Sequence, residues 1–223
     1  MKKYSRALRE ILHRVQEQNE NFMSQKSLAG ACEVSMDTVN RIVTKLSEFR
    51  AIEKKPFGFR VVEPKKVLLY WATTRNMTAD IVYSTYSPDS MEEIERDMPE
   101  GTVFTAFSGF QRRLGRALSG YDEVYVYSGR AEEIERRFPE RMVEHSNIFV
   151  LRSDPHLVKL SKGGVAPISQ IYVDLWQVGG SPADRYLLEL DQKFEAKTVE
   201  ALKALAKLEP SFGAAGKNST RPV

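Results

Sequence analysis

Residues 28–46 read LAGACEVSMDTVNRIVTKL, which places two short helical patterns on either side of a break at residues 33–34. Ser24 can cap the first helix and Ser35 the second, because a serine hydroxyl accepts a hydrogen bond from the backbone of the first turn. Apolar residues recur in both helices at the three- and four-residue spacing of a buried stripe. The positions that this spacing predicts to be buried are Leu28, Ala29, Cys32, Val39, Ile42, Val43, Leu46 and Phe49. The stretch therefore predicts two packed helices joined by a tight turn.

The neighbouring segments extend this pattern. Upstream, apolar residues at helical spacing predict a first helix over residues 2–18 with a charged outer face. Downstream, residues 51–55 and 59–63 are short strand-like runs on either side of a Pro-Phe-Gly turn, which predicts a hairpin. The expected order is helix, short helix, longer helix and hairpin.

The longer helix carries polar side chains on the face opposite its apolar stripe, and the hairpin adds basic ones at its tip. Side chains of these types hydrogen-bond base edges and phosphates. We therefore expect a DNA-binding surface made of Ser35, Asp37, Thr38, Asn40, Arg41, Thr44, Lys45, Lys54, Lys55 and Arg60.

The distribution of charge agrees with this expectation. Residues 1–63 hold 12 Lys and Arg against 8 Asp and Glu, a net charge of +4, whereas residues 64–223 hold 21 against 22, a net charge of −1. A basic excess confined to one segment is typical of nucleic-acid binding. An excess of this size supports the polar face and the hairpin but would not establish DNA binding alone.

Residues 24–62, SQKSLAGACEVSMDTVNRIVTKLSEFRAIEKKPFGFRVV, resemble a winged helix-turn-helix domain from end to end. The resemblance implies that Ala29 lies where the two helices cross, that Val34 fills the core place in the turn, and that Ser35 begins the recognition helix. The family usually has glycine in the turn, where Glu33 stands here, and a non-glycine residue with positive φ costs about 1 kcal/mol. We therefore expect a mildly strained or slightly different turn. The alternative is a three-helix core whose hairpin serves only protein contacts.

The remainder of the chain predicts strands that alternate with helices. A helix begins at Pro64 and carries large apolar residues, which favours packing between domains. Strands are expected at residues 80–86, 102–106, 123–127 and 148–152, and helices at residues 90–98, 107–118 and 131–138. This alternation is typical of a mixed sheet covered by helices, so the expected fold class is α+β.

The expected domains follow from these patterns. They are a winged helix-turn-helix domain over residues 1–63, a mixed α/β domain with a C-terminal helical hairpin over residues 64–196, and a C-terminal segment over residues 197–223. The last segment contains a helix of about residues 198–208 and a polar tail, residues 212–223, that we expect to be disordered.

Two pieces of the second domain look alike. YSPDSMEEIERDMPE at residues 86–100 and YSGRAEEIERRFPE at residues 127–140 each join a strand end to a helix that carries EEIER. Either a duplicated βαβ unit or convergence of two charged helices explains the similarity. In both cases the repeated glutamates are expected at the surface rather than in an acid catalyst; they are Glu92, Glu93, Glu132 and Glu133.

Residues 163–194 predict a tight helical hairpin. Pro167 can open the first helix, Gly179 can end it as a left-handed C-cap, and Ser181 can cap the second. The first helix reads P-x-x-Q-x-Y-x-D-L and is followed by Gly-Gly, a pattern similar to the C-terminal domain of AbiEi antitoxins. The matching positions are Pro167, Gln170, Tyr172, Asp174, Leu175, Gly179, Gly180 and Ala183.

AbiEi antitoxins are winged-helix transcriptional regulators of type IV toxin–antitoxin systems, and the similarity covers roughly residues 20–195. It implies a repressor that binds operator repeats in double-stranded DNA, often those of its own operon. Two DNA-binding heads are then needed, either in a homodimer or as cooperating monomers. It also implies a functional pairing with a nucleotidyltransferase-like toxin, without a stable complex. Within the motif, Asp174 either has a function of its own or is a structural carboxylate that holds backbone donors or a lysine near the Gly-Gly turn; we favour the second.

Residue types used in catalysis are scattered along the chain. A single cysteine and three distant histidines, His13, His145 and His156, give no zinc-binding spacing. No phosphate loop, dinucleotide fingerprint or nucleophile elbow occurs. We therefore expect that the protein is not an enzyme and that it binds no cofactor and no metal.

The strongest enzyme alternative is a metal-dependent nuclease built on Asp154, Glu189, Asp191 and Lys193. Such nucleases place Asp-x-Lys on a strand, where alternate side chains share a face. Here the segment continues a helical stripe, so Asp191 and Lys193 would point about 200° apart.

A second alternative is a ligand-sensing or protein-interaction module that does not bind DNA specifically. Its pocket would be lined by aromatic residues that fit an ordinary core equally well: Tyr83, Tyr86, Phe104, Phe107 and Phe110. Nearby, Arg112, Arg113 and Arg116 form either a further phosphate-contact surface or a solvated helix face.

The expected location is the cytoplasm. A single cysteine excludes an internal disulfide framework, and the basic N-terminus lacks the apolar core of a signal peptide. No segment approaches the roughly 18 apolar residues that a membrane helix needs. We therefore expect no membrane partner.

Overall fold

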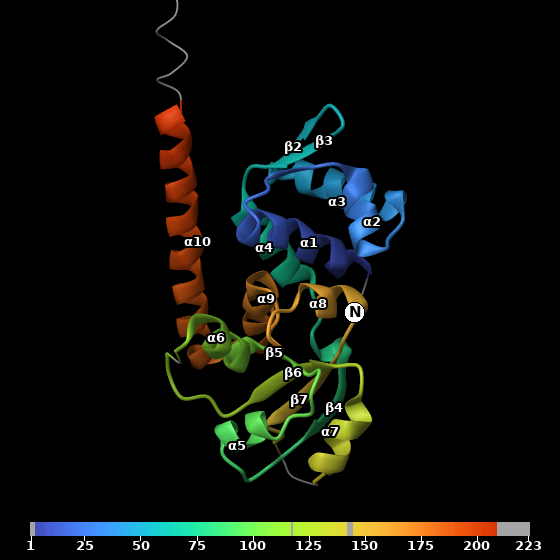
Figure 1. Ribbon diagram of the computed structural model, residues 1–223, viewed down its shortest axis with the longest axis vertical. Helices are drawn as coiled ribbons and strands as arrows, with labels where there is room; N and C mark the ends of the chain where they lie inside the picture. The colour runs from blue at the N-terminus through green and yellow to red at the C-terminus, as the bar shows by residue number, and fades with distance from the viewer. Residues whose placement is uncertain (1–2, 117, 142–144, 209–223) are drawn as a thin grey trace, which may run out of the picture. The chain divides into compact units, whose positions relative to one another are not determined.

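The computed structural model describes residues 3–116, 118–141 and 145–208 (Figure 1). Residues 1–187 form one compact unit and residues 188–223 a second, and each is described by itself. The described part combines helices with two β-sheets, so the predicted α+β class is confirmed. None of its helices is both long enough and apolar enough to cross a membrane.

The chain begins with three helices and a small antiparallel sheet. The elements are α1 (Lys3–Glu17), β1 (Phe22–Met23), α2 (Gln25–Cys32), α3 (Met36–Glu48), β2 (Ile52–Lys55) and β3 (Gly58–Val61). Both predicted caps are present, because Ser24 and Ser35 accept hydrogen bonds from the first turns of α2 and α3. The strands lie in the order β1-β3-β2. Strand β1 was not predicted, because two residues are too few to show a period.

The turn between α2 and α3 is strained, as the sequence predicts. Glu33 has φ 54° and ψ 48°, the left-handed conformation that a residue with a Cβ adopts at a cost. Its N–H donates to the carbonyl oxygen of Gly30 at 3.3 Å, and the N–H of Val34 donates to that of Ala29 at 3.1 Å. These bonds close the end of α2, and α3 begins at Met36 after a short turn.

The rest of the chain alternates helices and strands. The elements are α4 (Pro64–Thr74), a short 3-10 helix η1 (Thr78–Asp80), β4 (Ile81–Thr85), α5 (Met91–Arg96), β5 (Val103–Thr105), α6 (Ala106–Leu114), β6 (Val124–Ser128), α7 (Ala131–Arg137), β7 (Ile148–Arg152), α8 (Pro155–Leu160), α9 (Ile168–Val178) and α10 (Gly180–Leu208). The four strands form a mixed sheet in the order β4-β7-β6-β5. The two central strands are parallel and each edge strand is antiparallel to its neighbour.

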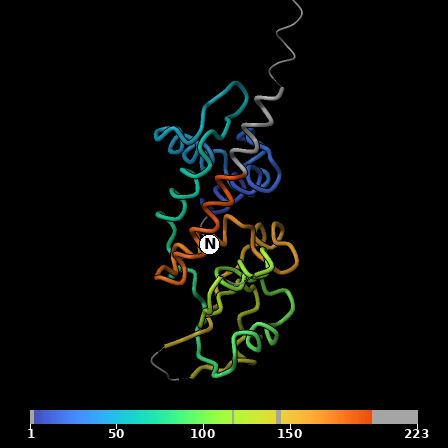
Figure 2. The backbone as a smooth tube through the Cα atoms, turned by 90° about the vertical axis from the view of Figure 1, so that its left-hand side faces the viewer, coloured from blue at the N-terminus to red at the C-terminus, as the bar shows by residue number. Residues whose placement is uncertain are grey.

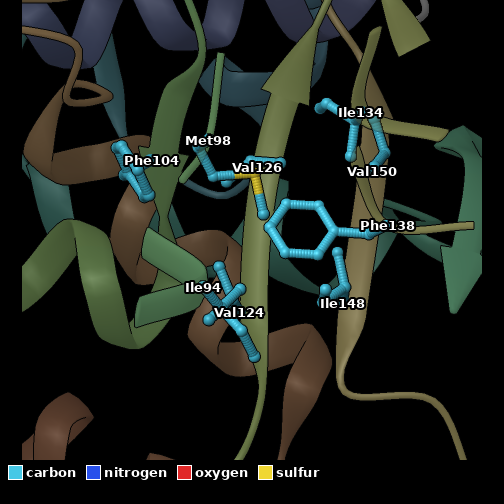
Figure 3. Close-up of a cluster of buried hydrophobic side chains, with 9 residues drawn as sticks. All are labelled: Ile94, Met98, Phe104, Val124, Val126, Ile134, Phe138, Ile148 and Val150. Carbon is cyan, nitrogen blue, oxygen red and sulfur yellow. The ribbon is translucent and has the colours of Figure 1, made fainter. Parts of the chain in front are cut away.

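Side chains of α5 and α7 pack with those of the strands on one face of this sheet (Figure 3). Ile94 and Ile134 are the isoleucines of the two EEIER repeats, and both are fully buried in the same apolar cluster. The cluster is completed by Met98, Phe104, Val124, Val126, Phe138, Ile148 and Val150. The repeated glutamates lie outside it, as predicted.

The two similar segments nevertheless occupy unequal places in the sheet. Strands β6 and β7 are parallel neighbours joined through α7, which makes a βαβ unit. Strands β4 and β5, joined through α5, lie at opposite edges. The similarity therefore extends to the burial of the helices but not to a repeated pair of adjacent parallel strands.

Helix α9 lies on the opposite face of the sheet and also packs against α1, α4 and α6. Figures 1 and 2 both place α8 and α9 between the first three helices and the sheet. This position explains why α1 differs from its prediction as a helix with a charged outer face. Several of its charged residues are buried among the surrounding helices: Arg9, Glu10, His13 and Arg14. Helix α1 is therefore a central element.

The segment predicted as a helical hairpin forms two helices, α9 and α10, and these differ from the prediction in two ways. Gly179 has φ 70° and ψ −170°, a positive φ that lies outside the left-handed helical region. Helix α10 begins at Gly180 rather than after a cap at Ser181, and it continues to Leu208. The separate helix predicted over residues 198–208 is therefore the last part of α10.

Other boundaries also differ from the sequence-based ones. Helix α6 ends at Leu114 rather than at residue 118, because Gly115 takes a left-handed conformation with φ 73° and ψ 12°. Helix α8 was not predicted, because six residues are too few to show a helical period. The tail that we expected to be disordered, residues 212–223, lies outside the described residues.

Replacing Glu33 with glycine should stabilise the protein. Glycine adopts a positive φ without the steric cost of a Cβ, so we expect the free energy of unfolding to rise by about 0.5–1 kcal/mol after its larger backbone entropy is counted. Urea unfolding followed by circular dichroism measures this change. Glu132→Gly in α7 is the matched control and should destabilise the protein by about 0.5–1 kcal/mol, because there glycine replaces a residue of ordinary helical geometry. If Glu33→Gly lowered the free energy of unfolding as Glu132→Gly does, Glu33 would not be strained.

Candidate functional site

The polar residues predicted on α3 lie together on one exposed face. The opposite face of this helix buries Val39, Ile42, Val43 and Leu46, which fixes its rotation about its own axis. As a result Asp37, Asn40, Arg41, Thr44 and Lys45 are exposed, and Thr38 is half-buried. Ser35 is exposed at the N-terminus of the helix.

Several of these side chains already have partners on the same helix. The hydroxyl of Ser35 accepts from the N–H of Thr38 at 3.2 Å and lies 2.9 Å from its hydroxyl, so Ser35 caps the helix and contacts the side chain of Thr38. Arg41 pairs with Asp37 at 2.6 Å. Lys45 pairs with Glu48 at 2.8 Å, and this hydrogen bond and charge raise the pKa of Lys45. Exposed pairs of this kind contribute about 0–1 kcal/mol, so another anion can replace the carboxylate at little cost.

The hairpin separates the three basic residues predicted at its tip. Lys54 is the register partner of the buried Phe59, whereas Arg60 is the partner of Glu53. Because strand side chains alternate between faces, Lys55 and Arg60 share one face and Lys54 lies on the other. Lys55 also pairs with Glu53 at 2.9 Å. The structure therefore brings two of the three cations together.

A chain of buried polar side chains joins the first helices to the sheet. It begins at Arg9 on α1, which has no exposed surface. Its Nη1 and Nη2 donate to the two carboxylate oxygens of Asp154 at 3.1 and 3.0 Å. Asp154 also caps α8 by accepting from the N–H of Leu157 at 3.0 Å. Burial alone would raise the pKa of Asp154, but the charge and hydrogen bonds of Arg9, together with the N–H of Leu157 and the charge of Arg6, outweigh it and lower the pKa.

Gln170 on α9 continues this chain. Its side-chain oxygen accepts from Nε of Arg9 at 2.9 Å. Its side-chain nitrogen donates to the hydroxyl of Tyr127 at 2.9 Å and to Oδ1 of Asp174 at 3.0 Å. The amide thus links α1 to α9 and to strand β6.

Asp174 is fully buried at the end of this chain. One of its oxygens accepts from the hydroxyls of Thr105 at 2.6 Å and Tyr127 at 2.8 Å, and the other pairs with Nε of Arg75 at 3.0 Å. Burial raises the pKa of Tyr127 well above its usual value, and Asp174 adds to this effect, so the phenol remains a donor. The structural interpretation of Asp174 is supported, although its partners are hydroxyls, an amide and an arginine rather than backbone donors or a lysine.

Glu10 and its neighbours form a second branch of this network. The carboxylate of Glu10 lies 2.8 Å from Nε2 of His156 and accepts from Nε of Arg14 at 2.7 Å. Burial alone would raise the pKa of Glu10, but the hydrogen bonds from His156 and Arg14 lower it to about 2. Sγ of Cys32 lies 3.9 Å from the same His156 nitrogen. Burial raises the pKa of Cys32 to about 12, so this cysteine lacks the thiolate that nucleophilic catalysis requires.

The residues of the nuclease alternative lie on two different elements, the N-terminus of α8 and helix α10. Asp154 is held by Arg9 and caps α8. Asp191 and Lys193 lie on α10, a helix, where two residues two positions apart cannot share a face. Within the part of the chain that the structure describes, no cluster of His, Cys, Asp and Glu side chains could hold a metal ion.

The aromatic residues of the ligand-sensing alternative make contacts in different parts of the structure. Phe107 and Phe110 pack edge-on against Tyr186, with ring centres 5.2 and 4.8 Å apart, and the hydroxyl of Tyr83 donates to the carbonyl oxygen of Phe138. Tyr86 instead borders a separate cavity of about 690 Å³. Its polar lining includes Ser87, Asp89, Asp122, Glu123, His145 and Asn147.

The arginines on α6 connect helices within the protein. Arg112 pairs with Glu95 at 3.0 Å and lies over the ring of Phe104, 3.8 Å from its centre. Arg113 pairs with Glu17 of α1. Glu17 also accepts from the N–H of Ile168 at 3.1 Å, at the start of α9. These contacts favour a structural role over a phosphate-contact surface.

Comparison of the chain with models of protein families, with curated proteins and with solved structures finds no match. The exposed α3 face, the hairpin beside it and the buried network are therefore the features from which a function can be inferred. Of these, the first two are accessible to a partner. The third lies inside the protein.

Replacing Asp174 with asparagine should strongly destabilise the protein. The substitution leaves the buried guanidinium of Arg75 with only the more distant carboxylate of Asp80, at 3.5 Å, and turns an NH2 group toward other donors. We therefore expect a loss of about 3 kcal/mol in the free energy of unfolding. Chemical denaturation measures this loss. The exposed Asp184→Asn is the control and should change stability by less than about 0.5 kcal/mol. If Asp174→Asn unfolded at the same denaturant concentration as Asp184→Asn, the network would not support the fold.

The buried carboxylates should make the protein sensitive to acid. Because the pKa of Glu10 is about 2 when folded against 4.5 for an ordinary glutamate, its ionised form favours the folded state above pH 4.5 and this contribution is lost as the pH falls toward 2. Glu10→Gln should therefore make the free energy of unfolding depend less steeply on pH. The loss of stability between pH 4.5 and pH 2 should be smaller than in the wild type by about 1–3 kcal/mol. Urea midpoints at several pH values between 2 and 5 test this. Glu20→Gln, at an exposed carboxylate, should change the slope less; an equal change would contradict the assignment.

Proposed function

We propose that this protein is a sequence-specific DNA-binding transcriptional repressor with an N-terminal winged helix-turn-helix domain. In this proposal α3 enters the major groove as the recognition helix, and the β2–β3 hairpin is the wing that contacts the neighbouring backbone. The observation that carries it is the row of exposed hydrogen-bonding side chains on α3, opposite a fully buried stripe.

The chemistry of that face suits base recognition. An asparagine amide can bond to adenine in a bidentate manner and an arginine guanidinium to guanine, and Asn40 and Arg41 are both exposed near the middle of α3. One helical turn further on, Thr44 and Lys45 can bond phosphates or bases. The tight turn at Glu33 supports the assignment, because a short αL turn brings α2 close to the start of the recognition helix.

The resemblance of residues 163–194 to AbiEi antitoxins extends the proposal to a biological role. The protein would then act in the cytoplasm on operator repeats, as a homodimer or as cooperating monomers, and repress its own operon. It would also counter a nucleotidyltransferase-like toxin without a stable complex.

One observation favours a second candidate function. Arg41, Lys45 and Lys55 each pair with a carboxylate on the same element, which lowers the positive potential of the surface. A nearly neutral polar face also suits a protein-contact module. In that case the domain would have the same fold but would not bind DNA specifically.

Selection of binding sites from random double-stranded DNA by the full-length protein, near physiological salt, decides between the two candidates. The repressor should enrich a motif, and two half-sites in it would reveal the symmetry of the bound form. A folded protein that enriches no motif would be the protein-contact module.

Asn40→Ala and Arg41→Ala should each weaken binding to the selected duplex. Loss of one bidentate base contact costs about 1–3 kcal/mol, so we expect the dissociation constant to rise about tenfold or more and discrimination at one base pair to fall. Fluorescence anisotropy with the selected duplex and single-base variants measures both. Stability should stay unchanged, because both side chains are exposed.

Arg136→Ala on α7 is the matched control for this experiment. Arg136 is also an exposed helical arginine that contacts the residue four positions earlier. Its removal should leave DNA affinity unchanged. If the two α3 variants bind as tightly as Arg136→Ala, another surface recognises the DNA.

A further inference from the structure

We propose that Phe57, at the tip of the β2–β3 hairpin, is an apolar wedge that inserts between base pairs from the minor groove. The inference rests on the proposed DNA-binding function and adds to it a second mode of recognition. The hairpin would then select DNA by how readily a base step unstacks, in addition to the base contacts of α3.

The first observation is the exposure of the ring. Phe57 is 94% exposed, more than any other large hydrophobic residue that the structure describes. Burying a phenylalanine side chain is worth about 1.5–3 kcal/mol, and the fold obtains none of this at residue 57. The ring is therefore available to a partner outside the chain.

The second observation is the backbone at the same residue. Lys55 and Gly58 are register partners, so Pro56 and Phe57 alone form the loop between the strands. Phe57 has φ 66°, in the second loop position, where turns of this kind favour glycine or asparagine. A bulky side chain with positive φ costs about 1 kcal/mol, and a strained residue of this type points to a function.

The adjacent glycine does not serve the turn. A Cβ at Gly58 would lie 2.4 Å from the carbonyl oxygen of Met23 and 3.0 Å from the ring of Phe22. Gly58 is therefore required by the close approach of β1, and the strained position is left to Phe57. The geometry thus holds a second aromatic ring, Phe22, directly beside the hairpin tip.

The surroundings of the tip favour DNA over an apolar protein surface. Phe22 is 40% exposed and is the register partner of Arg60, so both lie on the face that also carries Lys55. Exposed aromatic rings between basic side chains suit a nucleic acid, in which bases lie between rows of phosphates. On this face Lys55 pairs with Glu53 at 2.9 Å, and because exposed pairs of this kind are weak, a phosphate can replace the carboxylate.

A wedge of this kind has a known physical consequence. Inserting an apolar side chain between two base pairs partly unstacks them and bends the duplex, at a cost of a few kcal/mol per step. The cost is smallest at flexible pyrimidine–purine steps. We therefore expect such a step beside the motif that α3 recognises, at a position where no hydrogen bond to a base is made.

The test uses the duplex selected by the full-length protein, with 2-aminopurine placed in turn at each adenine that flanks the α3 motif. Binding of the wild-type protein should raise the fluorescence at one position, because 2-aminopurine brightens when it unstacks. Phe57→Gly should abolish this rise and weaken binding about tenfold, without lowering the melting temperature, since glycine relieves the positive φ. Phe57→Leu should retain part of both effects, because leucine is also apolar. Val158→Ala, which trims an exposed apolar side chain on α8, is the control and should behave as the wild type.

Three results would overturn the wedge. Wild-type affinity and fluorescence in Phe57→Gly would show that the ring does not touch DNA while the proposed function stands. Weaker binding by Phe57→Gly without any fluorescence rise in the wild type would show a contact that does not unstack bases. Failure of the wild type to select any duplex would overturn both proposals and leave the exposed ring to a protein partner.

Discussion

The buried guanidinium of Arg9 is the constraint on which the rest of the structure depends. A charge with no exposed surface is tolerable only when it is paired and hydrogen-bonded. Its partners, Asp154 and Gln170, lie 145 and 161 residues further along the chain. Helix α1 can therefore occupy the centre of the fold only if the N-terminus of α8 and the middle of α9 are in place around it. Apolar contacts are non-directional and would permit several orientations of these helices. The bidentate pair with Asp154 and the bond to Gln170 are directional, so they select one of these orientations.

Gln170 transmits this constraint to the sheet. Its amide oxygen accepts from Arg9 and its amide nitrogen donates to Tyr127 and Asp174. Rotating the amide would therefore place its NH2 group against the guanidinium of Arg9 and its oxygen against the carboxylate of Asp174. Asp174 then joins α9 to Arg75 and to the strand that ends at Thr105. The first helices, α9 and the sheet are thus connected by one hydrogen-bonded path.

Local sequence signals were sufficient to predict most of the helices and strands. They were not sufficient to predict contacts between residues that are remote in sequence. The caps at Ser24 and Ser35 and the polar face of α3 could be predicted, because each depends on a few neighbouring residues. The strained turn at Glu33 was expected instead from the resemblance to winged helix-turn-helix domains, which usually have glycine there. The burial of Arg9 could not, because a charged residue is normally at the surface and its partners are remote in sequence. At the hairpin, the Pro-Phe-Gly sequence located the turn. It could not show that Gly58 is required by the carbonyl of Met23, which leaves the positive φ to Phe57.

The protein thus contains two kinds of ion pair with opposite consequences. The pairs of Arg9 and Arg75 are buried, and removing either partner would leave a charge in a low-dielectric interior, so they are permanent parts of the fold. The pair of Arg41 and Asp37 is solvated, and its net contribution is about 0–1 kcal/mol. Arg41 can therefore leave Asp37 and bind a guanine or a phosphate at little cost. The helix that carries Arg41 stays fixed by its buried stripe. A surface whose side chains can change partners on a scaffold that cannot move is well suited to recognising a rigid polyanion. The network around Asp174 differs in this respect, because its bonds to Thr105, Tyr127 and Arg75 are buried and join parts of the fold.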